Sequence, residues 1–143
     1  LENTVSSPIG AYRWEHTDRA LREQLALEDE GYSASVSPGH AAVRFTNPTT
    51  GGDVMPTIRC QFHRLRAGAQ TLPSRDVGSS VFQVFDGAGS VDFNGQRHDI
   101  NIGDIFVVPS WIEWTLTTES GVDLFHFSDA PIMEKLSFNR HGV

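Results

Sequence analysis

The spacing of apolar residues changes once along the chain, and the change separates a helix from a series of strands. Within residues 16–31, Leu21 and Leu25 recur at an interval that places them on one helical face. A threonine or aspartate precedes them as a candidate N-cap, and a glycine follows the acidic end of the segment. The pattern predicts a helix from about Asp18 to Asp29.

Beyond this helix the apolar spacing becomes two, which is the period of a half-buried strand. Asn94 and Gly95 stand between two alternating segments and form a strong hairpin signal. Because strands follow one another without intervening helices, we predict an all-β fold, a closed antiparallel barrel or double-sheet jelly roll with one N-terminal α-helix. About eight strands are predicted, in residues 40–47, 55–67, 79–87, 89–95, 96–103, 104–109, 113–119 and 122–129.

Composition limits the domain count and the class of partner. The chain has 143 residues, of which 38% are apolar, and this supports one domain, residues 12–143, after a linker at residues 1–11. The net charge is -7 and the basic residues are scattered, so a nucleic-acid partner is not expected. The single cysteine, Cys60, excludes a disulfide framework and favours the cytoplasm. We expect neither a membrane span nor a signal peptide.

Glycine and proline residues follow the spacing of a known metal-binding barrel. Gly68, Gly87, Gly103 and Pro109 match, without an insertion, the turn positions of the two motifs that double-sheet barrels of the cupin kind carry. In such barrels two histidines two residues apart, a carboxylate and a third histidine hold the metal. An alternative stays open, in which these residues are ordinary turn residues.

The residues at the ligand positions do not suit a metal. Ser74, Asp76, Ser80 and Trp114 occupy these four positions, and Trp111 stands where the second motif has a glycine. One carboxylate, two hydroxyls and an indole offer too few electron pairs for a divalent transition metal. We therefore predict no metal site and no catalytic residue in this chain, and an interior that Trp114 fills or that an organic ligand occupies.

The histidines do not form a local metal motif either. No two of them stand two or four residues apart, so only a gathering of histidines distant in sequence could bind a metal. His63 and His126 lie in predicted strands, where a structural or surface role is expected. The remaining histidines are His16 before the helix, His40 in a loop, His98 at the hairpin and His141 in the tail.

Three longer segments resemble one enzyme family. Residues 12–31, 42–71 and 78–136 together look like the C-terminal half of gentisate 1,2-dioxygenase and its relatives that cleave salicylate or 1-hydroxy-2-naphthoate. The most specific element is the string NPTTGGDVMPTIRC, residues 47–60, and the resemblance covers about residues 10–140. It implies a bicupin parent, in which histidines of the N-terminal barrel hold Fe(II). It also implies that the ring of a small aromatic acid is cleaved in that barrel.

The resemblance implies that this chain is the other barrel, without a cofactor of its own. Its expected partners are the N-terminal cupin domain and further copies in a homo-oligomer, and its role is structural or interface-forming. An alternative is a stand-alone, metal-free cupin that binds a small organic acid in a degenerate pocket. For that pocket we predict six substrate-binding residues: Ser74, Asp76, Gln83, Trp114, Arg59 and Arg75.

Overall fold

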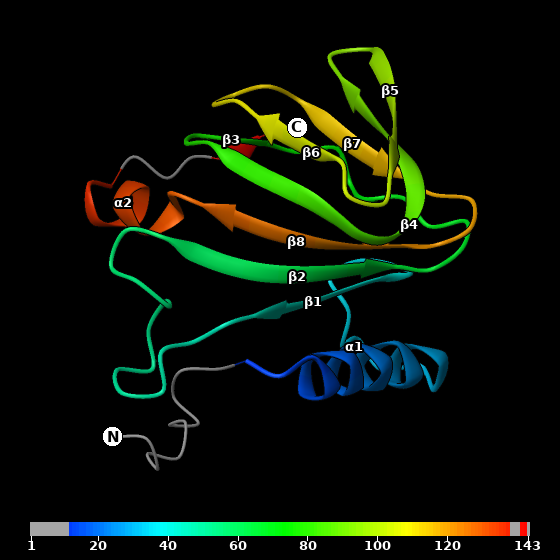
Figure 1. Ribbon diagram of the computed structural model, residues 1–143, viewed down its shortest axis with the longest axis horizontal. Coiled ribbons are helices and arrows are strands. Elements are labelled where there is room, and N and C mark those ends of the chain that lie inside the picture. Colours follow the sequence, from blue (N-terminus) through cyan, green and yellow to red (C-terminus); the bar gives the residue numbers. More distant parts are fainter. Residues whose placement is uncertain (1–11, 138–140, 143) are drawn as a thin grey trace, which may run out of the picture.

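The computed structural model describes residues 12–137 and 141–142, so the predicted linker at residues 1–11 lies outside the described part. Two helices and nine strands are present in the described residues, and the prediction of an all-β fold with one N-terminal helix is confirmed (Figure 1). The elements are α1 (Trp14–Asp29), β1 (His40–Arg44), β2 (Arg59–Leu65), β3 (Arg75–Asp76), β4 (Ser80–Phe93), β5 (Gln96–Asn101), β6 (Ile105–Val108), β7 (Trp114–Thr117), β8 (Val122–Ser128), α2 (Ala130–Lys135) and β9 (His141–Gly142).

Strand β4 joins two antiparallel layers. Its first half pairs with β8 and β6, and β2 and β1 extend that layer beyond β8. Its second half pairs with β5 and β7, which form the opposing layer. The sequence predicted two strands here, divided near Gly87. The structure has one strand that bends, because Gly87 adopts a positive φ of 84° and the β4–β8 register shifts between Val84 and Asp86.

The predicted hairpin is confirmed. Phe93 pairs with Gln96, and Asn94 and Gly95 between them have φ values of 49° and 89°. Two successive positive φ angles match the twist of the flanking strands, and an Asn-Gly pair adopts them at low cost. Helix α2, which begins directly after Asp129, was not predicted from the sequence.

Helix α1 packs on the outer face of β1 and β2 (Figure 1). Its leucines Leu21 and Leu25 are buried there with Ala41 and Phe62. The helix begins at Trp14, one turn before the predicted start, and the Trp14 ring lies 5.0 Å from that of Phe62. Packing of this ring stabilises a first turn that has no apolar repeat of its own.

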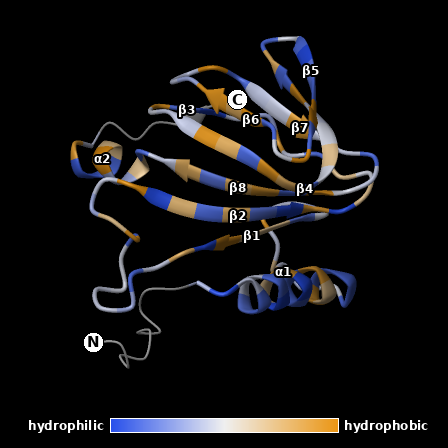
Figure 2. Cartoon of the chain, in the orientation of Figure 1, coloured by the Kyte–Doolittle hydropathy of each residue, from blue (hydrophilic) through white to orange (hydrophobic). Residues whose placement is uncertain are grey.

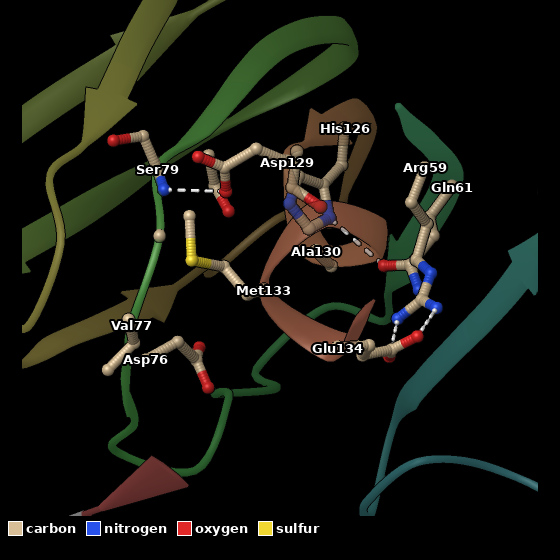
Figure 3. A pocket seen from close by; sticks show the side chains of 13 residues that line it. Arg59, Gln61, Asp76, Val77, Ser79, His126, Asp129, Ala130, Met133 and Glu134 are labelled. Carbon is tan, nitrogen blue, oxygen red and sulfur yellow. Dashed lines mark hydrogen bonds and ion pairs between the residues drawn. The ribbon is translucent and has the colours of Figure 1, made fainter. Parts of the chain in front are cut away.

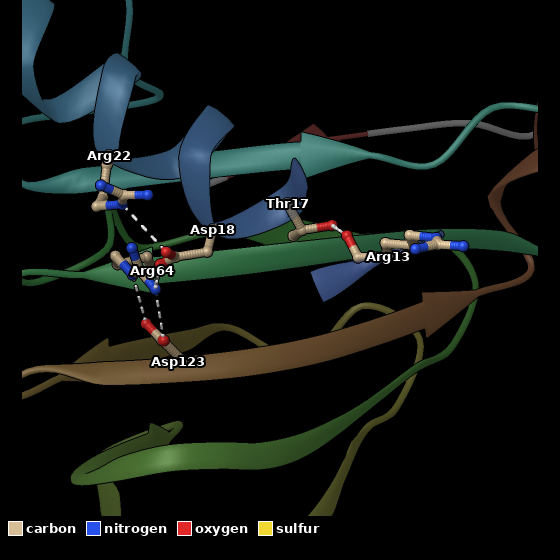
Figure 4. Close-up of polar contacts among 6 residues, drawn as sticks. All are labelled: Arg13, Thr17, Asp18, Arg22, Arg64 and Asp123. Atoms are coloured by element: carbon tan, nitrogen blue, oxygen red, sulfur yellow. Dashed lines mark hydrogen bonds and ion pairs between the residues drawn. The ribbon is translucent and has the colours of Figure 1, made fainter. Parts of the chain in front are cut away.

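Arg64 fixes the position of α1 over the sheet (Figure 4). Its guanidinium donates to Asp123 of β8 at 2.9 Å and to Asp18 of α1 at 2.8 Å. The side chain of Arg64 is only 18% exposed, so water screens these ion pairs less than it screens a surface pair. Arg64 thereby joins the helix to two strands.

The main core lies between the two layers. It contains Phe82, Val84, Leu116 and Leu124, which are all at most 2% exposed. Alternation of polar and apolar residues along the strands is visible as alternating colours in Figure 2.

No helix within residues 12–137 and 141–142 is long and apolar enough to cross a membrane.

Candidate functional site

The glycines of the predicted barrel motifs adopt backbone conformations that favour glycine. Gly68, Gly87 and Gly103 have φ values of 81°, 84° and 88°. Trp111, which replaces the glycine of the second motif, has a φ of 60°, a left-handed conformation that is uncommon for a bulky side chain. The backbone geometry of the motif is therefore present although its metal-binding side chains are not.

The four ligand positions divide between two cavities. Ser74 and Trp114, joined by an isolated backbone bridge, line an apolar cavity of about 190 Å³ between the layers. Asp76 and Ser80 line a second, more polar cavity of about 190 Å³ beside α2. We refer to these as the interior cavity and the α2 cavity. The Trp114 ring lies 5.1 Å from that of Phe82 and packs against the main core.

The arrangement does not fit an iron site. No group of three or more His, Cys, Asp or Glu side chains in the described residues is arranged to hold a metal ion. The one carboxylate at a ligand position, Asp76, faces a different cavity from Ser74 and Trp114. The side chains at the four ligand positions therefore offer too few metal ligands, and they do not face one common cavity.

The remaining predicted pocket residues are not brought together. Arg59 lines the α2 cavity, but its guanidinium is already engaged by Asp53 at 2.9 Å. Glu134 lies 2.8 Å from the same guanidinium (Figure 3). Arg75 lies 3.4 Å from Glu113 and over the Trp111 ring, outside both cavity linings.

Gln83 is exposed and alternates with the buried Phe82 and Val84 along β4. Its side chain therefore points to the outer face of the layer, away from both cavities.

Three histidines distant in sequence meet on the inner face of the barrel. His40, His63 and His126 belong to the neighbouring strands β1, β2 and β8. His40 Nε2 lies 2.9 Å from His63 Nδ1, and His63 Nε2 lies 3.0 Å from His126 Nδ1. All three line the interior cavity. We call this arrangement the histidine chain. The sequence did not predict it, because a gathering of distant histidines was considered only as a way to bind a metal.

The geometry of the histidine chain is that of hydrogen bonds. His63 uses its two ring nitrogens on opposite neighbours, so the three rings do not converge on one point where a metal could lie. His126 Nδ1 also lies 3.0 Å from Gln61 Oε1, which can only accept. His126 Nδ1 therefore carries the proton, His63 donates from Nδ1 to His40, and each ring is neutral.

Burial keeps these rings neutral. Desolvation lowers the pKa of His40 to about 4 and that of His126 to about 4, and Arg59 adds to the shift of His126. Desolvation also lowers the pKa of His63 well below its usual value, with His126 and His40 as further causes. The His126 ring stacks on Phe82 with 4.1 Å between centroids.

Sequence comparisons find dioxygenases that are similar to this chain. No family model matches the chain. It is 52% identical over 135 residues to a gentisate 1,2-dioxygenase from a Streptomyces species and 33% identical over 135 residues to a 5-aminosalicylate 1,2-dioxygenase from a Comamonas species. These matches cover 94% and 93% of this chain but only 38% and 35% of the relatives.

A solved structure is similar over nearly the whole chain. The salicylate 1,2-dioxygenase from Pseudaminobacter salicylatoxidans is 67% identical, with a TM-score of 0.92 over 98% of this chain. The match covers 40% of that protein's chain. This chain therefore spans about two fifths of the length of its relatives.

Proposed function

The chain belongs to the gentisate 1,2-dioxygenase family, and from this premise we propose that it is the C-terminal, metal-free cupin domain of an Fe(II)-dependent ring-cleaving dioxygenase. The predicted cupin barrel is confirmed by the similarity to the salicylate enzyme. In the proposed parent, iron and the aromatic acid bind in the N-terminal barrel. The observation that supports the proposal is the division of the four ligand positions between two cavities, Ser74 and Trp114 in one and Asp76 and Ser80 in the other.

An exposed apolar surface supports an interface-forming role. Outer positions of β4, β6 and β8 lie side by side, since Val81 pairs with both Val107 and Phe127. Ile105 is 65% exposed and Val107 is 53% exposed, although both are aliphatic residues of regular strands. We define the outer apolar face as Val81, Phe85, Ile105, Val107, Phe125 and Phe127.

We propose that the N-terminal barrel of the parent covers this face. An exposed cluster of this kind is characteristic of interaction surfaces. About three fifths of the relatives' length lies outside the match, which is enough chain for a second barrel of similar size. Homo-oligomers and a cytoplasmic location, favoured by the lone cysteine, remain part of the proposal.

Replacing Ile105 by lysine in the full-length parent tests the interface. Ile105→Lys should lower the unfolding free energy by at least about 2 kcal/mol or separate the subunits, because it loses apolar burial and places a charge in the contact. Light scattering after size exclusion and denaturant unfolding measure both effects. In the isolated chain the same change should be nearly neutral.

Ile102 provides a matched control, because it is also 65% exposed but lies in the β5–β6 turn. Ile102→Lys should leave stability and assembly of the parent unchanged. Equal effects of both substitutions in the parent would argue against an interface on the outer apolar face.

Loading with iron tests the metal-free role. We expect the isolated chain, incubated anaerobically with Fe(II), to bind less than one tenth of an equivalent. It should also form no ring-opened product from gentisate after oxygen is admitted. Stoichiometric iron retained on desalting, or turnover, would overturn this part of the proposal.

A further inference from the structure

We propose that the interior cavity is a binding site for a small, uncharged aromatic alcohol, a phenol with one ring, which the proposed supporting role does not require. The cavity lies between β2 and β8 on one side and β7 on the other. Its wall includes the rings of Phe82 and Trp114 and the side chains of Leu65, Leu116 and Leu124.

A hydroxyl without a partner marks one end of this cavity. Ser37 is only 7% exposed, lines the cavity, and its Oγ has no hydrogen-bond partner among the described residues. Leaving a buried hydroxyl unsatisfied costs free energy, so such groups usually meet a ligand or water. A ligand hydroxyl that donates to Ser37 Oγ or accepts from it would remove this cost.

The position of Ser37 is fixed by its surroundings. It opens a tight turn to His40, whose backbone N donates to the Ser37 carbonyl at 2.9 Å. Within this turn the Gly39 backbone N donates to Glu28 of α1 at 2.9 Å. The hydroxyl is therefore presented from an anchored turn, which favours binding because little further ordering is required.

The cavity has room for one ring. Its volume of about 190 Å³ is slightly above the roughly 150 Å³ of an apolar protein cavity that accepts benzene. A single water, with a share of about 30 Å³ of liquid volume, would satisfy Ser37 but leave most of the apolar wall uncovered. Because this volume is close to that of a one-ring site, we expect two fused rings to bind more weakly than one.

The residues that line the interior cavity disfavour a charged ligand. None of the described lining residues is an acid, a lysine or an arginine. The low pKa values of His40 and His126, about 4, keep the histidine chain uncharged at neutral pH. Arg59, one of the predicted substrate-binding residues, lines the α2 cavity and is paired with two acids. An aromatic acid would therefore enter the interior cavity without a counter-ion, at a desolvation cost.

Calorimetry and NMR titration of the intact 143-residue chain with phenol, benzoate and 2-naphthol test the proposal. Phenol should bind with a Kd on the order of 0.1–1 mM, as a ligand of this size allows. It should shift the resonances of Ser37 and Trp114, and benzoate and 2-naphthol should bind at least tenfold more weakly. Absence of phenol binding at 20-fold above that range, about 20 mM, or equal affinity for benzoate, would overturn it.

Substitution of Ser37 distinguishes a ligand site from a filled core. Ser37→Ala should weaken phenol binding about 5–10-fold, as expected for one lost hydrogen bond. The free variant should be as stable as the wild type or more stable, because an unsatisfied hydroxyl is removed. Ser120→Ala, in an exposed turn, is the control and should leave phenol affinity unchanged. Unchanged affinity in Ser37→Ala would contradict the assigned contact.

Discussion

Lowering the pH from 7 to 4.5 should strongly destabilise the chain, because the histidine chain is neutral only in the folded state. In the unfolded chain each histidine takes up a proton near pH 6.5. Folding lowers the pKa of His40 and of His126 to about 4. The contribution of each neutral ring to the unfolding free energy is therefore complete above pH 6.5 and is lost as the pH falls towards 4. This loss amounts to up to about 3 kcal/mol for either residue.

Other titrating groups act in a different pH range. Salt bridges lower the pKa of Asp18, Asp29 and Asp53, so their contribution is lost only below their usual value of 3.8. Four charged side chains, Arg59, Asp76, Asp129 and Glu134, line the α2 cavity, which His126 also lines. A loss of stability between pH 6.5 and 4.5 therefore reports the histidine chain.

Denaturant unfolding at several pH values measures this effect. His126→Gln keeps a polar group but does not titrate, so its unfolding free energy should change less between pH 7 and 5 than that of the wild type. The difference should be about 2 kcal/mol. His98→Gln, at an exposed position of β5, is the control and should retain the wild-type pH dependence. Parallel pH profiles for all three proteins would show that the histidine chain is not the cause.

Replacing Gly87 by alanine should be the most damaging change among the motif glycines. A Cβ atom there would overlap the carbonyl oxygen of Gly121 and lie 3.0 Å from the Cα atom of Val122. Both contacts are backbone, so neither can rotate away. With the cost of a positive φ, we expect a loss of at least about 3 kcal/mol in unfolding free energy.

Gly103→Ala separates the two causes. Gly103 has a φ of 88°, close to the 84° of Gly87, but nothing lies within 4 Å of a Cβ atom built there. Only the strain of a positive φ applies at this position, so we expect the unfolding free energy to fall by about 1 kcal/mol. Denaturant unfolding of both variants provides the comparison, and equal losses would show that the close approach of Gly121 is accommodated.

Local features were predictable because they depend on neighbouring residues. The α1 leucines, the period-two strands and the Asn94–Gly95 hairpin each express a preference that acts within a few residues. The eight predicted segments correspond to seven strands of the structure, since residues 79–87 and 89–95 both belong to β4. The two short strands β3 and β9 carry no comparable pattern and were missed.

Pairing between distant strands decided what the sequence left open. Alternation alone places His63 and His126 on one face of their strands, but only the antiparallel register of β2 with β8 brings their rings together. That pairing joins residues about 60 positions apart, so no short spacing could announce it. Tertiary packing also gave Arg59 and Arg75 different acidic partners, Asp53 and Glu134 for Arg59 and Glu113 for Arg75.

The sequence by itself determined the β-rich barrel, its N-terminal helix, the turn glycines and the poverty of metal ligands, because each follows from side-chain chemistry and local periodicity. Only the tertiary structure decided which side chains share a cavity. It gathered His40, His63 and His126 around an apolar space with the unpaired Ser37 hydroxyl, and it placed Asp76 elsewhere. The physical reason is that strand register and layer packing are set by burial over the whole chain, whereas each residue carries only its own preference.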